Sequence, residues 1–222
     1  MNYKITLTLC VACIGLLSSL SAQVPAKKAL KTSRNSLNGV DSLFVERWSP
    51  RAMSGKSISD QDLKALFEAA RWAPSSYNEQ PWRFIYAKRG TPAWDTLFNL
   101  LVPFNREWCK NGAVLVVMVS KKTSSRGGLN PLHSFDTGSA WENLALQGSL
   151  KGLVVHGMGG FDYEKARAVL AIPADYVVEA MCVIGNPAAI DVLPDYMREM
   201  EKPSERKPLD QIAAEGSFTF KE

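Results

Sequence analysis

The sequence predicts an α+β domain in which helices flank one central sheet. Residues 113–120 form an almost uninterrupted apolar run, which is typical of a strand covered on both faces. Residues 60–73 and 136–151 carry apolar side chains at helical spacing. Strand and helix patterns alternate loosely, and the strands are few, which favours one mixed domain. The chain of 222 residues is long enough for a large core.

Residues 1–22 have the pattern of a secretory signal peptide, with Lys4 ahead of an apolar run and small residues before Gln23. We expect cleavage near Ala22 and export to a periplasm or to the exterior. The apolar run is short for a membrane span, so no stable membrane insertion is expected. Residues 23–39 are expected to form a flexible mature amino terminus. Residues 40–222 then form the domain, with an extended C-terminal tail.

The composition argues against several kinds of partner. The formal net charge is +4, with both signs spread along the chain, so no nucleic-acid partner is expected. Outside residues 1–22, two histidines and no Cys-x-x-Cys give no metal-site spacing. Cys10 and Cys13 fall in the signal peptide, which leaves Cys109 and Cys182. One disulfide is possible in an oxidising compartment, but the apolar surroundings of both residues favour buried free thiols.

The first two helices are predicted from their caps. Asp41 can cap a short helix over residues 41–47, which Pro50 ends. Ser59 and Asp62 have the spacing of a capping box at the start of the second helix. The predicted apolar face of that helix consists of Leu63, Leu66, Phe67 and Ala70.

A polar loop follows the second helix, between Pro74 and Pro81. Its side chains that can hydrogen-bond are Ser75, Ser76, Asn78, Glu79 and Gln80. Because proline restricts the backbone at both ends, the loop is suited to presenting donors and acceptors in a fixed geometry. Taken alone, it fits a surface turn better, since Pro, Ser and Asn favour turns.

The middle of the chain predicts alternating strands and helices. We expect a strand over residues 82–88, a helix over 93–102, the central strand over 113–120, a mobile loop over 121–132 and a long helix over 136–151. The expected buried face of the long helix is Trp141, Leu144, Ala145 and Gly148, and Gly152 is expected to follow its C-terminus.

The last third of the chain predicts a short strand over residues 153–156, a glycine turn, a helix over 162–170 capped by Asp162, and a final strand over 177–184. The chain beyond residue 190 is charged and interrupted by proline, and it lacks a core pattern of its own. We expect this tail to wrap a partner subunit.

The motifs exclude several enzyme classes. The sequence has no Gly-x-Ser-x-Gly elbow, phosphate-binding P-loop, His-Glu-x-x-His or Gly-x-Gly-x-x-Gly after a strand. The glycine run at residues 157–160 allows close backbone approach to a flat or anionic ligand, although plain turns often have this composition. Arg47 and Arg51, with distant Arg206 and Lys207, can hold one phosphate. Each of these cations taken alone fits a solvated surface.

Together these segments resemble the FMN-dependent nitroreductase family. Residues 47–51 (Arg-Trp-Ser-Pro-Arg) are similar to its Arg-x-Ser-x-Arg/Lys element, and residues 74–82 to its Pro-Ser-x-x-Asn-x-Gln-Pro-Trp loop. The further matches are Phe104-Asn105, the central helix at 136–144, the flavin-facing turn at 157–162 and the C-terminal phosphate element at 206–209. The resemblance covers residues 40–213 in the family's order.

The resemblance implies a nitroreductase-like single domain with a mostly antiparallel sheet, in an intertwined homodimer with FMN at the subunit interface. The implied cofactor-binding residues are Arg47, Trp48, Ser49, Arg51, Pro74, Ser75, Ser76, Asn78, Asn105, Met158, Gly159, Gly160, Arg206 and Lys207. Arg47 and Ser49, with Arg206 or Lys207, are implied to hold the ribityl phosphate. The loop at residues 74–78 is implied to come from the other subunit.

Arg51 and Asn105 are implied to face the pyrimidine edge of the flavin, where Arg51 tunes the charge, and the backbone of residues 159–160 is implied to approach N5. Trp108 stands where many members have a lysine. Trp48 replaces a more usual polar residue, which favours a packing role for it.

The resemblance implies an enzyme that passes electrons from NAD(P)H through FMN to a nitroaromatic, a quinone or free flavin in two steps. The flavin carries the chemistry, so no side chain is assigned as catalytic. A same-fold alternative is a dehalogenating or flavin-fragmenting enzyme. An alternative from another class is an exported FMN-binding or scavenging protein without NAD(P)H turnover. The position of His156 at a strand end favours a hydrogen-bonded core residue over a proton donor.

Overall fold

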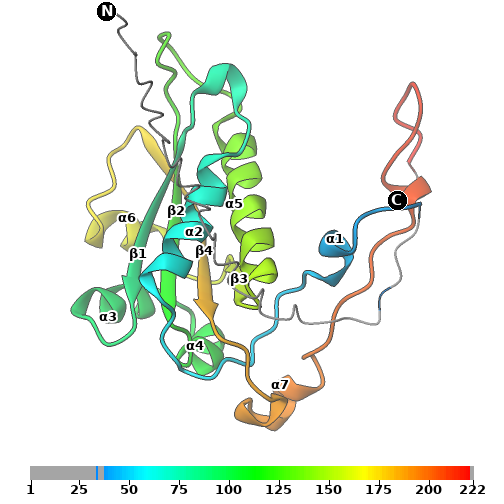
Figure 1. Cartoon of the computed structure of the whole chain (residues 1–222). Helices are drawn as coiled ribbons and strands as arrows, with labels where there is room; N and C mark the ends of the chain where they lie inside the picture. Colours follow the sequence, from blue (N-terminus) through cyan, green and yellow to red (C-terminus); the bar gives the residue numbers. More distant parts are fainter. Residues whose placement is uncertain (1–33, 35–37, 221–222) are drawn as a thin grey trace, which may run out of the picture.

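Helices cover both faces of a four-stranded antiparallel sheet, which gives three layers (Figure 1). The computed structural model describes residue 34 and residues 38–220. The predicted signal peptide at residues 1–22 and most of the expected flexible segment at 23–39 lie outside the described residues. Within the described part of the chain, no helix has the length and apolar character needed to cross a membrane.

The sheet has the strand order β1-β2-β4-β3, and each neighbouring pair is antiparallel. Its strands are β1 (Trp82–Lys88), β2 (Val114–Lys121), β3 (Val154–Met158) and β4 (Tyr176–Gly185). Strand β2 is central, and every residue from Val114 to Ser120 is buried. The predicted α+β class and the predicted central strand are therefore confirmed.

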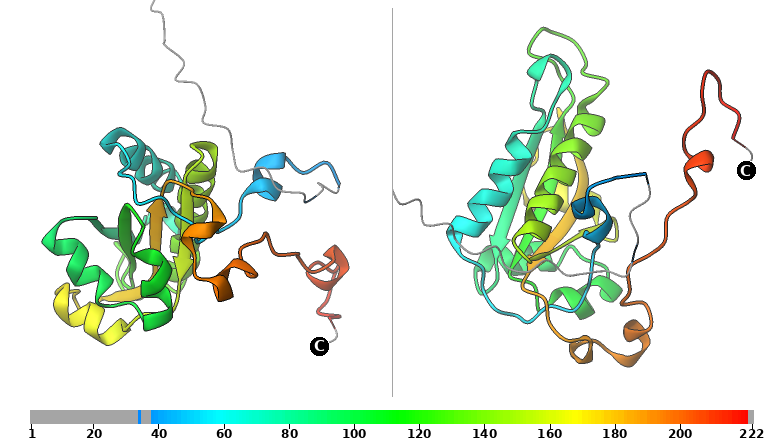
Figure 2. Two further views of the ribbon diagram at one scale, coloured as in Figure 1. Left: turned by 90° about the horizontal axis from the view of Figure 1, so that it is seen from below. Right: turned by 45° about the vertical axis from the view of Figure 1, so that its right-hand side comes forward.

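The two faces of the sheet belong to two separate cores. One face is covered by α2 (Asp60–Arg71) and α5 (His133–Leu150), and the other by α3 (Pro92–Phe98), α4 (Pro103–Cys109) and α6 (Tyr163–Val169) (Figure 2, left). Along β2, Val116 and Met118 pack under α2 and α5, whereas Leu115 and Val117 pack on the other side. This alternation follows the two-residue period of a strand and explains the apolar run.

Several predicted helix caps are present. Asp41 accepts a hydrogen bond from the Leu43 amide (2.8 Å) at the start of α1 (Ser42–Glu46). Ser59 Oγ accepts one from the Asp62 amide (3.0 Å) at α2. At α6, Asp162 caps the helix in the same way. Each cap satisfies an amide that has no partner inside its helix.

The helix predicted over residues 93–102 is wrong in its second half. Helix α3 ends at Phe98, and Val102 has an extended backbone because Pro103 disfavours a helical conformation at the residue before it. Pro103 instead begins α4. Among the other elements, α5 begins three residues before the predicted start at 136, and β3 continues to Met158.

Both cysteines of the described chain are buried and unbridged, at Cys109 and Cys182. Burial raises the pKa of each thiol well above its usual range. Because the thiolate is the reactive form, both residues act as small apolar core residues, as the sequence predicts.

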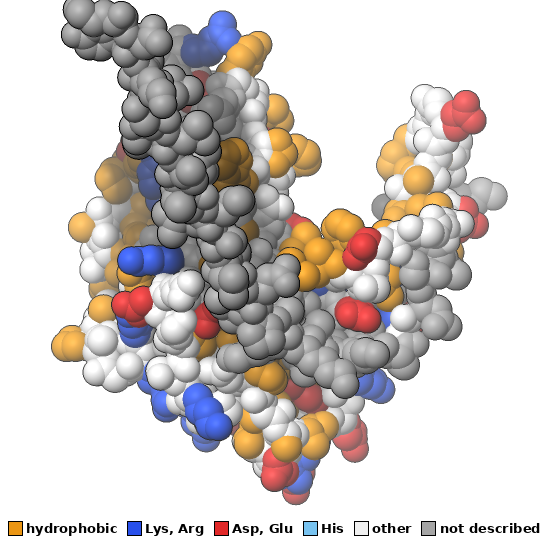
Figure 3. Space-filling view, viewed as in Figure 1, with side chains coloured by type: hydrophobic (Ala, Val, Ile, Leu, Met, Phe, Trp, Pro, Cys, Tyr) orange, Lys and Arg blue, Asp and Glu red, His pale blue; other side chains and the backbone are white. Residues whose placement is uncertain are grey.

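The chain leaves the globular body after α7 (Asp195–Arg198) and extends away from it as an arm, residues 202–220 (Figures 1 and 2). The arm contains one short 3-10 turn, Leu209–Gln211; the two other such turns are Ser76–Asn78 and Ile190–Val192. Its apolar side chains are exposed, at 61% for Leu209 and 85% for Phe218. Figure 3 shows an open hollow between body and arm, with hydrophobic surface where the two meet.

Candidate functional site

A cavity of about 540 Å³ lies beside the edge of the sheet, where β3 ends. Its walls come from α5, from the end of β3, from the middle of β2 and β4, and from the segment before Pro50. The lining residues are Arg47, Ser49, Met118, Ser134, Thr137, Gly138, Trp141, Glu142, Gly157, Met158, Gly159, Glu179 and Ala180. This volume is in the range of small-molecule sites. Four predicted cofactor-binding residues are among them: Arg47, Ser49, Met158 and Gly159.

Arg47 is held at one end of the cavity by polar contacts. Its Nη1 donates to Ser49 Oγ (3.4 Å), and its Nε lies 3.6 Å from Glu142 Oε1 on α5. The side chain of Arg47 is only 16% exposed. A guanidinium held in this way is prepared for a phosphate or carboxylate, because its geometry matches two oxygens at once. Trp48 between them is half-buried and does not line the cavity.

The glycine turn after β3 presents its backbone at the other wall. Gly159 is exposed, and a Cβ there would meet nothing nearer than Tyr163 Oη at 3.6 Å. Gly160 is different, since its carbonyl accepts hydrogen bonds from Asn105 Nδ2 (3.0 Å) and the Val102 amide (3.1 Å). The turn is therefore fastened to α4 through Gly160, while Gly159 stays open to a ligand.

Asn105 is buried and serves as the link in that fastening. Its Oδ1 accepts from Trp108 Nε1 (3.3 Å) while its Nδ2 donates to the Gly160 carbonyl. Trp108, which is 2% exposed, belongs to the core and contacts His156, with the two rings tilted and their centres 4.5 Å apart. Trp108 is thus a core tryptophan that positions Asn105.

Arg51 lies behind this wall, with its guanidinium carbon 5.8 Å from the centre of the Trp108 ring. Its Nε is buried and has no hydrogen-bond partner among the described residues. Glu201 holds the adjacent backbone, because its Oε1 accepts from the amides of Arg51 (2.7 Å) and Ala52 (2.8 Å). The arm therefore begins next to a predicted ligand residue.

His156 behaves as the sequence predicts. Its Nδ1 lies 3.0 Å from the Pro50 carbonyl, and burial lowers the pKa of His156 to about 4, with Arg51 and Arg47 acting in the same direction. The imidazole is therefore neutral near pH 7 and donates to Pro50 through Nδ1. It fixes the segment that carries Arg47 and Arg51 to β3.

We expect this histidine to make stability depend on pH. The unfolded chain takes up a proton near pH 6.5, whereas folded His156 does so only near pH 4. Stability is unaffected above pH 6.5 and falls by up to about 3 kcal/mol as pH drops toward 4. Thermal unfolding of His156→Gln, which keeps a donor but does not titrate, should show a smaller pH slope. An equal slope in both proteins contradicts this account.

The proline-bounded loop is strained and does not line the cavity. Tyr77, Asn78 and Gln80 all have positive φ angles (49°, 57° and 47°), which residues other than glycine rarely adopt. Glu79 holds the loop by accepting hydrogen bonds from Ser124 and Ser125. Backbone strain of this kind collects at functional sites and persists only where surrounding contacts enforce it.

The four ligand residues predicted in this loop are not brought to Arg47 within one chain. The Ser76 amide donates to Asp136 Oδ2 (3.1 Å) at the start of α5, and Ser75 Oγ accepts from the Gln80 amide (3.0 Å). Pro74 and Asn78 are exposed. None of these four residues lines the cavity of its own chain. Their predicted role in a partner's site stays a prediction.

Arg206 and Lys207 lie on the arm and are exposed, outside the cavity. They line a second hollow of about 530 Å³ together with Arg34. Arg34 Nη2 donates to the Arg47 carbonyl (2.8 Å), so the two hollows are neighbours. Burial, with the nearby charges of Arg206 and Arg47, lowers the pKa of Arg34. This convergence of positive charge suits an anion.

Sequence reasoning missed the α5 and β4 walls of the cavity, among them Thr137, Glu142 and Glu179. Thr137 is 2% exposed, and its Oγ1 has no hydrogen-bond partner among the described residues. The available signal was a helix face that alternates small and polar residues over 134–142, where a purely structural helix would be apolar.

The residues fit a flat, anionic cofactor. The cation Arg47 stands at one end of the cavity, the backbone at Gly159 is open, and Thr137, which lines the cavity, has a buried Oγ1 without a partner among the described residues. Buried polar groups normally have partners, so an unpaired hydroxyl in the cavity wall is expected where a ligand completes the site.

Comparison with known proteins gives consistent relatives. The model of the nitroreductase family matches residues 45–93. A protein of Archaeoglobus fulgidus, provisionally named an NADH dehydrogenase/NAD(P)H nitroreductase, is 30% identical over 157 residues, which cover 65% of this chain and 83% of the relative. A crystal structure described as an oxidoreductase containing FMN matches with a TM-score of 0.83 and 42% identity, covering 86% of this chain and 98% of that one. A protein of Desulfovibrio desulfuricans, provisionally described as a nitroreductase in complex with FMN, shares the fold at 24% identity and a TM-score of 0.65, covering 82% and 99%.

Proposed function

Because this chain belongs to the nitroreductase family, we propose that it is an FMN-dependent oxidoreductase that passes electrons from NAD(P)H to a nitroaromatic, a quinone or free flavin. The observation that carries the proposal is the cavity between Arg47 and Gly159, in a chain 42% identical to an FMN-containing oxidoreductase. A bound FMN would supply the hydride-accepting and electron-donating chemistry of a two-step transfer from the nicotinamide to the acceptor.

The chain's own residues hold and orient this cofactor. Arg47 and Ser49 bind the phosphate, with Arg206 or Lys207 completing its charge neutralisation. The exposed backbone of Gly159 allows close approach of the ring system. Arg51, behind the wall next to Trp108, would supply a positive charge that tunes the bound cofactor from outside the cavity.

We also propose that the functional unit is a homodimer in which each arm packs on the other subunit. The arm exposes Leu209, Ile212 and Phe218, which a single chain leaves in water. Burial of such side chains against a second copy is favourable by about 1.5–3 kcal/mol each. The strained loop, which does not line the cavity of its own chain, is the part that we assign to the partner's site.

One preparation tests the function against its rival. We expect a yellow dimer that bleaches with NADH or NADPH under anaerobic conditions and recolours with a quinone. A yellow dimer that neither nicotinamide reduces supports the exported FMN-binding protein, and a colourless monomer refutes both readings. We further propose export, from the pattern of residues 1–22. The mass of the mature chain tests it, since a retained Met1 refutes cleavage.

A further inference from the structure

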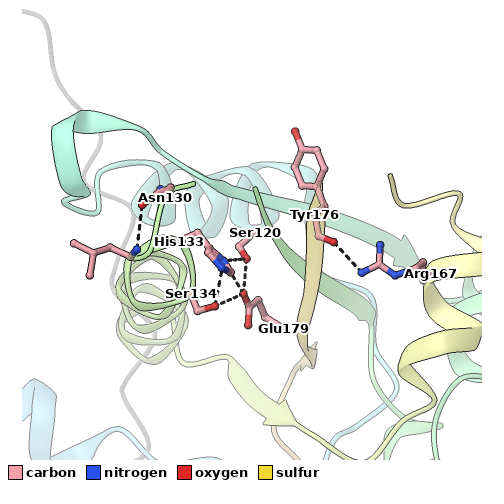
Figure 4. Close-up of polar contacts among 8 residues, drawn as sticks. Ser120, Asn130, His133, Ser134, Arg167, Tyr176 and Glu179 are labelled. Carbon is pink, nitrogen blue, oxygen red and sulfur yellow. Dashed lines mark hydrogen bonds and ion pairs between the residues drawn. The ribbon is translucent and has the colours of Figure 1, made fainter. Parts of the chain in front are cut away.

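The end of the cavity away from Arg47 is built from polar side chains that none of the roles above uses. Ser120 on β2, His133 and Ser134 on α5, and Glu179 on β4 form one cluster (Figure 4). With its proton on Nδ1, His133 donates to Ser120 Oγ (2.7 Å), and Ser120 Oγ donates to Glu179 Oε1. Ser134 Oγ also donates to Glu179 Oε1 (2.7 Å).

A β-bulge delivers Glu179 to this position. Met118 pairs with Ala180, but the next residue, Val119, pairs with Val178, so Glu179 is the extra residue of β4. Val178 is buried in the core on the α3 side. Glu179 and Ala180 both line the cavity, although successive residues of a strand normally face opposite sides. Counted back from Met181, which lies in the same core as Val178, strict alternation would point a side chain at 179 into that apolar core. Bulges re-aim side chains in this way, and they are frequent beside active sites.

The two oxygens of Glu179 have different surroundings. Both serine hydroxyls donate to Oε1, whereas Oε2 accepts no hydrogen bond from any described residue. The Glu179 side chain is 23% exposed and lines the cavity. In Figure 4 its second oxygen points away from the cluster. A carboxylate oxygen is an acceptor only, so this end of the cavity is prepared for a donor.

The cavity walls between the Arg47 end and the Glu179 end suit a flat ring. Gly157 and Trp141 are in such close contact that a Cβ at Gly157 would lie 3.0 Å from the indole. Met118 and Ala180 form the floor on the sheet side. Ser134 and Glu142 lie at the two ends of the cavity, and α5 rises about 12 Å between them. Glu179, beside Ser134, is therefore separated from the Arg47–Glu142 pair by more than the length of one aromatic ring.

We propose that Glu179, with Ser134 and Thr137, is a substrate-recognition subsite that selects aromatic acceptors bearing an ammonium, amino or hydroxyl substituent. The proposal rests on the proposed function, since it names the substrate class of the same cavity. Glu179 Oε2 accepts the hydrogen bond, and Ser120 and Ser134 fix the carboxylate. Acceptors with a carboxylate substituent are rejected because two like charges would meet without a counter-ion.

The test compares Glu179→Gln with the wild-type holoenzyme on 4-nitrobenzylamine, 4-nitrobenzoate and nitrobenzene. A hydrogen bond to a charged group predicts that kcat/KM for 4-nitrobenzylamine falls roughly tenfold or more. The value for 4-nitrobenzoate should rise, and that for nitrobenzene should stay unchanged. For each acceptor, kcat/KM of the variant is divided by kcat/KM of the wild type, so the intrinsic reactivity of the acceptor cancels. Glu164→Gln on α6 removes the same charge away from the cavity and should leave all three values unchanged.

An unchanged preference between the ammonium and carboxylate acceptors in Glu179→Gln overturns the proposal. Failure of the wild type to reduce any of the three excludes nitroaromatic acceptors, and failure with a quinone and with free flavin as well refutes the proposed function instead. The subsite is then judged by calorimetric binding, where 4-nitrobenzylamine must bind the wild type more tightly than 4-nitrobenzoate does, and equal affinities overturn the subsite.

If Glu179→Gln does not fold, Thr137→Val replaces it. This change keeps the shape of the side chain and removes a buried hydroxyl that lacks a partner, so the midpoint of thermal unfolding should not fall. Affinity for 4-nitrobenzyl alcohol should drop several-fold, while affinity for nitrobenzene stays the same. Equal changes for both compounds contradict the subsite.

Discussion

Deletion of residues 203–222 should give a folded monomer that no longer retains FMN. The deletion removes the exposed apolar side chains of the arm, and with them Arg206 and Lys207, but leaves Glu201 bound to the backbone of residues 51 and 52. A charged hydrogen bond contributes about 1.5–3 kcal/mol, so losing the cation that holds the phosphate, Arg206 or Lys207, weakens FMN binding roughly 10- to 100-fold. Loss of the partner's loop adds to this.

Light scattering and FMN titration of the apoprotein measure the two effects separately. The matched control is the full-length variant with Arg206→Ala and Lys207→Ala, which keeps the apolar arm. It should remain a dimer and bind FMN more weakly than the wild type but more tightly than the truncated chain. A truncated protein that is still dimeric, or that binds FMN as the wild type does, shows that the arm does not assemble the site.

Gly160→Ala should destabilise the protein, whereas the neighbouring Gly159→Ala should not. A Cβ at Gly160 would lie 2.7 Å from Asn105 Nδ2 and 3.1 Å from Val102 Cγ2. Asn105 cannot yield freely, because it is 9% exposed and accepts a hydrogen bond from Trp108. Overpacking of this kind costs about 1–3 kcal/mol, which lowers the midpoint of thermal unfolding by roughly 2–12 °C.

Calorimetry of the two ligand-free variants checks this contrast. The Cβ of Gly159→Ala meets only Tyr163 Oη, at an ordinary contact distance of 3.6 Å, so the midpoint should stay within about 2 °C of the wild type. FMN affinity should nevertheless decrease, since the new methyl group stands at the open side of the turn. Equal destabilisation by both substitutions would mean that the turn is not fastened through Gly160.

Local signals predicted most of the fold. The caps at Asp41, Ser59 and Asp162 and the apolar run of β2 depend on neighbouring residues, so the sequence contains their full explanation. The error between residues 99 and 102 arose where Pro103 outweighed a helical pattern. Helix propensity summed over a window of residues gives too little weight to the single proline at position 103.

The candidate site was predicted only where residues act near their own position in sequence. The Arg47–Ser49 pair and the glycine turn were found, and they line one cavity. Glu179 was not, because its orientation depends on a bulge in the pairing of β2 with β4. Asn105 was expected to face the flavin, yet in this chain both of its polar atoms bond within the protein. That contact depends on packing between distant segments, which spacing alone does not reveal.

The contact of Glu201 with the backbone of Arg51 and Ala52 has a thermodynamic consequence. One carboxylate oxygen joins the residue just before the arm to the segment that carries Arg51, so the arm and this segment reorient only together. Coupling free energies between two sites are reciprocal. If seating the arm on a second subunit tightens cofactor binding by some factor, cofactor binding must strengthen the association of the subunits by the same factor. Assembly and cofactor loading then form one cooperative equilibrium.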